Sequence, residues 1–150
     1  MYSDILVLVR TTFEREILLG ELMALKDSLF EPKKGPENIL KDEVRVSVAN
    51  IIRSKLEKGE KLESYIDGLV RTLDGLTEVK FELPKEPTER EIGLIYDWLT
   101  TNVPSGAIIA YSINPSVLGG ATISHKGRYY DGSLRTILES TLKEVYSSYA

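Results

Sequence analysis

The chain of 150 residues has 42% hydrophobic and 28% charged side chains, a balance typical of folded globular proteins and not of disordered ones. This length suffices for one ordinary domain or for two small ones. The net charge of −4 lacks the basic surface that binding to nucleic acid or to acidic lipid needs, so the sequence predicts neither partner. The absence of cysteine excludes disulfides, thiolate nucleophiles and cysteine-bound zinc, and the single histidine, His125, cannot form a multi-histidine metal site.

The N-terminal segment contains a short apolar run from Ile5 to Val9, with no basic residue before it and with Arg10 directly after it. A secretory signal needs a longer apolar region, and a membrane-spanning helix needs about 20 apolar residues. No other segment approaches this length. We therefore expect a soluble protein that is neither exported nor inserted directly into a membrane.

The first half of the chain shows helical periodicity. Its apolar residues recur at steps of three and four, at Ile5, Leu8, Val9, Ile17, Leu18, Leu22, Leu25 and Leu29. This pattern predicts a single amphipathic helix that ends near Phe30, with a weak point at Gly20. Two more helices are predicted over 37–58 and 61–73, so residues 1–75 are expected to form a small helical bundle.

The second half, residues 76–150, opens with a strand pattern followed by a helix pattern. Apolar and charged residues alternate over 79–83, which is typical of a half-buried strand. Thr88 and Glu91 have the spacing of a capping box, which predicts a helix that begins there and ends near Thr101.

The rest of the chain predicts further strands and a final helix. Strands are expected over 107–113 and 121–124, and a tight turn over 125–128 returns the chain to the sheet. Ser133 is placed to cap a last helix over 134–146. The fold class is therefore predicted to be α+β: a helical bundle followed by a small βαββα unit that ends in a helix.

Two adjacent glycines, Gly119 and Gly120, suggest a phosphate-binding loop. The further glycines, and the lysine with serine or threonine that such loops carry, are missing, and no helix is predicted directly after the pair. A glycine pair entering a strand also marks a bulge or a close backbone approach, and the sequence favours this structural interpretation.

A few residues suggest acid–base or nucleophilic chemistry. Asp131 and Ser133 could form a nucleophile with its partner, but the only possible histidine base, His125, is predicted in a turn. A turn followed by a helix cap accounts for Asp131 and Ser133 without chemistry, and His125 could alternatively sense pH. Glu89 and Glu91 could act as paired carboxylates, but a first helical turn favours acidic residues in any case.

The C-terminal half also contains the longest recognisable motif of the chain. Its fixed points, in chain order, are Asn114-Pro115, Gly119-Gly120, Gly127, Asp131-Gly132-Ser133-Leu134-Arg135 and Leu138. This order resembles the C-terminal signature of the delta subunit of F-type ATP synthases, the family whose mitochondrial counterpart confers oligomycin sensitivity. The resemblance covers roughly residues 76–146.

The resemblance implies a non-catalytic subunit of the peripheral stalk, or stator, with no cofactor and no metal. Family members bind the N-terminal segments of the alpha subunits at the top of the catalytic head, through a bundle of six helices. Their C-terminal part binds the b-type stalk helices. This holds the head still while proton flow drives ATP synthesis. The resemblance thus implies a peripheral location at the cytoplasmic face of the membrane, with a shortened N-terminal bundle in this chain.

Contact with the stalk would involve the end of the chain. Tyr129 and Tyr130 are adjacent on a predicted strand, so one of them faces outward, and tyrosine is common at protein interfaces. The apolar residues of the predicted terminal helix serve either as core or as stalk contacts: Leu134, Ile137, Leu138 and Leu142.

Three other interpretations remain open. The E-type stalk protein of V-type ATPases also combines N-terminal helices with a C-terminal strand–helix unit and a Gly-Gly strand, so a protein similar to it is one alternative. A stand-alone adaptor could use the same fold for a different protein partner. A small enzyme would use Asp131, Ser133 or His125.

Overall fold

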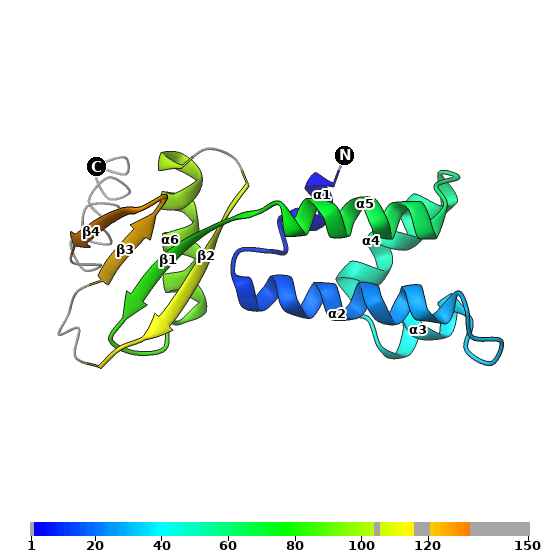
Figure 1. Ribbon diagram of the computed structural model, residues 1–150. Coiled ribbons are helices and arrows are strands. Elements are labelled where there is room, and N and C mark those ends of the chain that lie inside the picture. The colour runs from blue at the N-terminus through cyan, green and yellow to red at the C-terminus, as the bar shows by residue number, and fades with distance from the viewer. Residues whose placement is uncertain (1, 104–105, 116–120, 133–150) are drawn as a thin grey trace, which may run out of the picture. The chain divides into compact units, whose positions relative to one another are not determined.

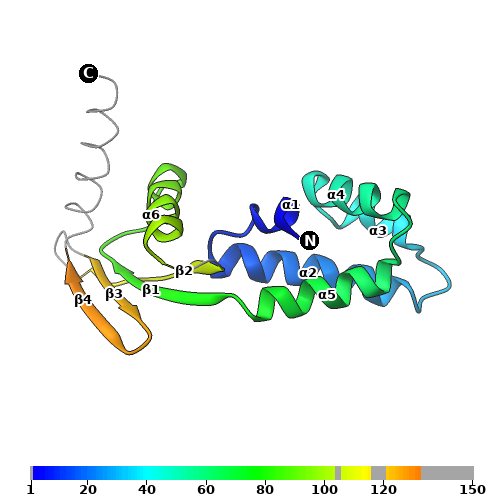
Figure 2. The same cartoon turned by 90° about the horizontal axis from the view of Figure 1, so that it is seen from above.

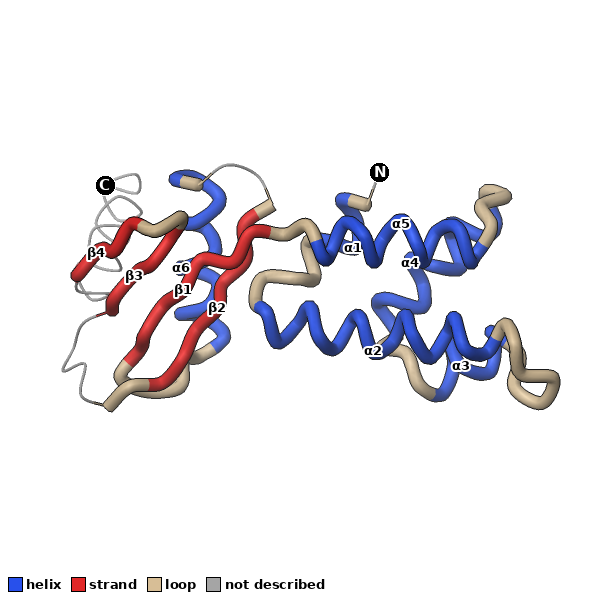
Figure 3. The backbone as a smooth tube through the Cα atoms, in the orientation of Figure 1, coloured by secondary structure: helices blue, strands red, loops and turns tan. Residues whose placement is uncertain are grey.

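The computed structural model describes residues 2–103, 106–115 and 121–132. The chain divides into two compact units (Figure 1). One unit consists of Met1–Val9 and Phe13–Gly75, and the other of Arg10–Thr12 and Leu76–Ala150. Helices make up the first unit, and strands follow in the second (Figure 3). The predicted α+β class is thus confirmed.

The first unit contains five helices where the sequence predicted three. They are α1 (Ser3–Leu6), α2 (Thr12–Ser28), α3 (Pro36–Asp42), α4 (Val46–Glu57) and α5 (Leu62–Asp74). Their buried faces supply the core of the unit. Its fully buried large side chains are Ile5, Leu18, Leu22, Leu25, Leu40, Ile52, Ile66, Leu69 and Leu73.

The predicted single helix before Phe30 is wrong in its first part, because α1 ends at Leu6 and α2 begins only at Thr12. The chain between them is extended at Arg10 and Thr11. Thr11 forms a parallel bridge with Ile109, whose N–H donates to the Arg10 carbonyl over 2.8 Å. This pairing satisfies backbone groups that a helix would otherwise use, and helical periodicity alone does not reveal it.

The predicted helix over 37–58 is also divided, into α3 and α4. The break is centred on Arg45, the N-cap of α4, whose backbone is extended with φ −55° and ψ 141°. Its N–H donates to the Glu21 carboxylate over 2.9 Å. The Glu21 side chain of α2 therefore accepts the hydrogen bond of a backbone N–H at the start of α4. The third predicted helix is confirmed as α5.

The second unit has a four-stranded mixed sheet in the described part of the chain. Its elements are β1 (Thr77–Leu83), α6 (Glu89–Asn102), β2 (Ala107–Ile113), β3 (Ala121–His125) and β4 (Arg128–Gly132). The strand order is β2-β1-β3-β4, with β1 and β2 parallel and the other neighbours antiparallel. The sheet has one strand more than the predicted βαββα unit, and the predicted terminal helix over 134–146 lies outside the described residues.

Helix α6 covers one face of this sheet (Figure 2). The alternation in β1 directs Val79, Phe81 and Leu83 into the core against α6, as the sequence predicted. The capping box is present too: the Glu91 N–H donates to the Thr88 hydroxyl over 3.2 Å, and the Thr88 N–H donates to the Glu91 carboxylate over 2.8 Å. Local residues thus define where α6 begins.

Candidate functional site

Of the signature residues that the structure describes, Asn114 and Pro115 directly follow β2, where the Asn114 N–H donates to the Leu83 carbonyl over 2.7 Å, and the others belong to the β3–β4 hairpin. His125 pairs with Arg128, so Lys126 and Gly127 form a two-residue turn. Their φ angles are 47° and 73°, the left-handed region that favours glycine at the second position. The predicted tight turn is therefore present, and Gly127 shapes its backbone.

The end of β4 contains two more signature residues. Asp131 is paired with Thr122, and Gly132 with Ala121, so both lie beside the start of β3. Tyr129 is paired with Ser124 one step from the turn, and its description is confined to the backbone. The remaining predicted residues lie outside the described part of the chain: Gly119, Gly120, Ser133, Leu134, Ile137, Leu138 and Leu142. Their binding roles stay predictions.

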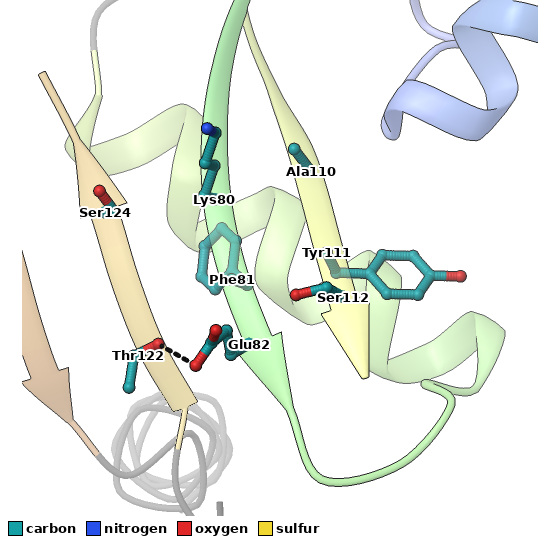
Figure 4. A pocket seen from close by; sticks show the side chains of 8 residues that line it. All are labelled: Lys80, Phe81, Glu82, Ala110, Tyr111, Ser112, Thr122 and Ser124. Atoms are coloured by element: carbon teal, nitrogen blue, oxygen red, sulfur yellow. Dashed lines mark hydrogen bonds between the residues drawn. The ribbon is translucent and has the colours of Figure 1, made fainter. Parts of the chain in front are cut away.

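The face of the sheet opposite α6 contains a pocket of about 410 Å³ (Figure 4). Side chains from three strands meet there in two cross-strand rows. The first row is Ala110–Lys80–Ser124 and the second is Ser112–Glu82–Thr122. The sequence alone does not reveal this site, because only the strand order brings these residues together.

Polar and apolar side chains both line this pocket. The Glu82 carboxylate accepts a hydrogen bond from the Thr122 hydroxyl over 3.2 Å. Lys80, Ser112 and Ser124 line the same pocket. The arrangement can donate and accept hydrogen bonds and pair with a charged group.

The residues that suggested catalysis have structural contacts. Glu91 belongs to the capping box, and the Glu89 carboxylate accepts a hydrogen bond from Arg10 over 2.8 Å. His125 lies at the turn end of β3, and its buried Nδ1 has no hydrogen-bond partner among the described residues. Within those same residues, no three histidine or acidic side chains gather where they could hold a metal ion.

The helical unit is tied together by ion pairs between distant helices. The Glu21 carboxylate on α2 accepts two hydrogen bonds from the Arg45 guanidinium, each over 2.9 Å, and this pairing raises the pKa of Arg45. Lys55 of α4 lies 3.0 Å from Asp4 of α1. Burial alone would raise the pKa of Asp4, but the hydrogen bond and charge of Lys55 lower it below its usual value. These contacts fix the bundle and leave the outer face of α2 outside the core.

That outer face combines exposed apolar side chains with the exposed charged residues Glu16 and Asp27. Five of the large apolar side chains that the structure describes as exposed lie on α2 or directly after it: Phe13, Ile17, Met23, Leu29 and Phe30. The sequence assigned Ile17 and Leu29 to the core-facing stripe, but each is 37% exposed. The error arises because leucine-rich α2 has apolar residues on both sides, so periodicity alone does not separate its two faces.

No family model matches the sequence, and no curated protein matches it significantly. Among the helices of the described residues, none combines the length and apolar character that crossing a membrane requires.

Proposed function

We propose that this protein is a non-catalytic subunit of the peripheral stalk of an F-type ATP synthase, of the delta type. In this role it links the catalytic head to the b-type stalk helices, and the head stays still while proton flow drives ATP synthesis. It acts at the cytoplasmic face of the membrane as part of the complex.

The β3–β4 hairpin is the observation that carries this proposal. Three residues of the delta-type signature fall within it: Gly127 in the turn, and Asp131 and Gly132 at the end of β4. Each occupies a position that shapes or pairs the backbone. A family signature that serves structure and not catalysis predicts such positions for its residues.

The helical unit adds a second line of support. A delta-type subunit has six helices before its C-terminal part, and three predicted helices fitted this poorly. The described residues contain five helices before Gly75, so the bundle is closer to that number than periodicity indicated. Several such helices can hold a partner segment by apolar packing, which resists torque without any chemical step.

The test is to purify an affinity-tagged copy of the chain from its native membranes in a mild detergent and to identify the proteins that accompany it. We expect alpha and b-type subunits of ATP synthase in amounts comparable to the tagged chain. Recovery of V-type stalk subunits, or of unrelated proteins alone, would contradict the proposal.

Depletion of the protein provides the functional counterpart. Membrane vesicles without it should lose proton-driven ATP synthesis and keep ATP hydrolysis by the head, because a head without a stator turns with the rotor. Loss of hydrolysis as well would indicate a catalytic role, and unchanged synthesis would exclude a stator role.

A further inference from the structure

The pocket on the sheet face opposite α6 contains two opposite charges on a single strand. Lys80 and Glu82 are two residues apart on β1, so their side chains leave the same face of the sheet (Figure 4). Their Cα atoms lie roughly 7 Å apart, because a strand rises about 3.3 Å per residue. The pocket therefore has a positive end at Lys80 and a negative end at Glu82.

Hydroxyl groups from the neighbouring strands lie beside each end. Ser124 of β3 is paired with Lys80. Ser112 of β2 and Thr122 of β3 are both paired with Glu82. The Thr122 hydroxyl donates to the Glu82 carboxylate over 3.2 Å, which holds this carboxylate in place. Because a serine hydroxyl both donates and accepts hydrogen bonds, Ser124 can supply a donor beside the cation and Ser112 an acceptor beside the carboxylate.

The two charges select the kind of ligand. An anion alone would meet the Glu82 carboxylate, and Glu78 adds another carboxylate on the same face of β1. A cation alone would meet the Lys80 ammonium. A molecule that carries both an ammonium and a carboxylate can pair with both ends of the pocket at once. The charge pattern thus favours a zwitterion.

The dimensions of the pocket narrow this class further. Its volume of about 410 Å³ lies in the range of small-molecule sites, about 300–1,000 Å³. In a single α-amino acid, one carbon atom separates the ammonium from the carboxylate. In an extended dipeptide the two groups are roughly 6 Å apart, because its Cα atoms are about 3.8 Å apart and a bond of about 1.5 Å follows at each end. The spacing of Lys80 and Glu82 therefore matches a dipeptide more closely than a single amino acid.

We propose that this pocket reversibly binds a zwitterion of the size of a dipeptide along β1. The ligand carboxylate pairs with Lys80 and accepts a hydrogen bond from Ser124. The ligand ammonium pairs with Glu82 and donates to Ser112. This inference goes beyond the proposed function, because a stator role uses no small ligand and every residue that lines the pocket belongs to the sheet unit.

The test is a titration of the isotope-labelled full chain with alanyl-alanine, followed by NMR. We expect saturable shifts of the amide signals of β1 and β3 around the pocket. Two capped forms of the same dipeptide are the matched controls: N-acetyl-alanyl-alanine lacks the ammonium, and alanyl-alanine amide lacks the carboxylate. Each should bind more weakly by roughly tenfold or more, because each leaves one charge of the pocket unpaired. Free alanine should also bind more weakly, because it cannot span both charges.

Variants of the chain then locate the site. Lys80→Met removes the cation and keeps an unbranched side chain, and Glu82→Gln removes the charge and keeps an acceptor for Thr122. Each should weaken binding of alanyl-alanine by roughly tenfold or more, with an unchanged circular dichroism spectrum. Lys85→Met makes the same change as Lys80→Met at an exposed residue outside the pocket, so it is the matched control and should leave binding unchanged.

A charge exchange provides a further check. Lys80→Glu alone should abolish binding, whereas Lys80→Glu combined with Glu82→Lys keeps both charges in reverse order and should restore it in part. Several results would overturn the inference: no saturable binding of alanyl-alanine, equal binding of the dipeptide and its capped forms, or equal losses in Lys85→Met and the pocket variants. Tighter binding of the acetylated form would assign the pocket to anions instead, and equal binding of free alanine would exclude the dipeptide.

Discussion

The two units of this protein differ in what determines the limits of their elements. In the helical unit, the two breaks that the sequence did not predict coincide with contacts to distant residues, such as that of Arg45 with Glu21. In the sheet unit, the capping box of Thr88 and the turn at Gly127 use residues only a few positions apart. Periodicity therefore predicts the kind of element in both units, but the limits of an element follow from the sequence only where a local signal sets them.

The largest expected effect is a loss of stability in one unit when its core is truncated, which tests whether the two units unfold separately. Phe81 is 1% exposed and packs in a cluster whose members all belong to the sheet unit. Phe81→Ala should lower the free energy of unfolding of that unit by about 3–5 kcal/mol, because it leaves a large cavity. Hydrogen exchange should show reduced protection of β1 amides and unchanged protection of α4 amides.

The matched change in the helical unit is Leu22→Ala, at a side chain with 0% exposure. It should reduce the protection of α4 amides and leave that of β1 amides unchanged. The free energy of unfolding of the helical unit should fall by about 2–5 kcal/mol. If either substitution lowers the exchange protection equally in both units, the two units unfold as one cooperative structure and are not independently stable.

The second prediction tests the distant contact in the helical unit. Glu21→Ala removes the carboxylate that binds both the backbone N–H and the guanidinium of Arg45. Stability should fall by about 2 kcal/mol, since charged hydrogen bonds are lost but the partially exposed Arg45 remains hydrated. Urea unfolding measures this. Glu16→Ala on the same helix is the control and should change stability by no more than about 0.5 kcal/mol.

The sheet unit could be predicted in detail because its signals are local. The alternation of apolar and charged residues predicted β1, and the capping box of Thr88 and Glu91 predicted the start of α6. The glycine at position 127 predicted the turn of the hairpin. The helical unit could be predicted only in outline. No local feature announces that Arg10 will pair with β2, because the hydrogen bond joins it to Ile109 across about a hundred residues.

The surfaces were harder to predict than the elements. The pocket on the sheet depends on β1 lying between β2 and β3, which places Lys80 between Ala110 and Ser124. The sequence does not show that Phe13 and Met23 are exposed, because apolar residues on a helix are usually assigned to a core. The turn pattern over 125–128 predicted the hairpin that contains Gly127, because a local signal sets that turn.

The third prediction compares two glycines of the sheet unit. Gly127 has a φ of 73°, so Gly127→Ala forces a side chain into the left-handed region and should cost about 1–2 kcal/mol. Gly93 lies within α6, where an added Cβ meets no heavy atom within 4 Å. Gly93→Ala should therefore stabilise the protein by up to about 1 kcal/mol. Thermal unfolding measures both, and effects of the same sign would contradict the assignment of the turn.

The smallest effect at neutral pH is expected for a tyrosine of the helical unit. The Tyr65 side chain is 3% exposed, packs against Tyr2 with 5.4 Å between ring centroids, and its hydroxyl has no hydrogen-bond partner in the described part of the chain. In the sheet unit, by contrast, the Tyr111 hydroxyl donates to Glu86 over 2.6 Å. Tyr65→Phe should be neutral or slightly stabilising at pH 7, because it removes a polar group that nothing satisfies.

The same residue predicts how stability changes at high pH. Burial, with a smaller contribution from the charge of Asp4, raises the pKa of Tyr65 to about 12, from about 10 for an exposed phenol. The folded state thus favours the neutral phenol, so this contribution is complete below pH 10 and is lost as the pH rises toward about 12. Urea unfolding between these values should show a steeper loss in the wild type than in Tyr65→Phe. Equal slopes in the wild type and in Tyr65→Phe would mean that Tyr65 does not govern the alkaline transition.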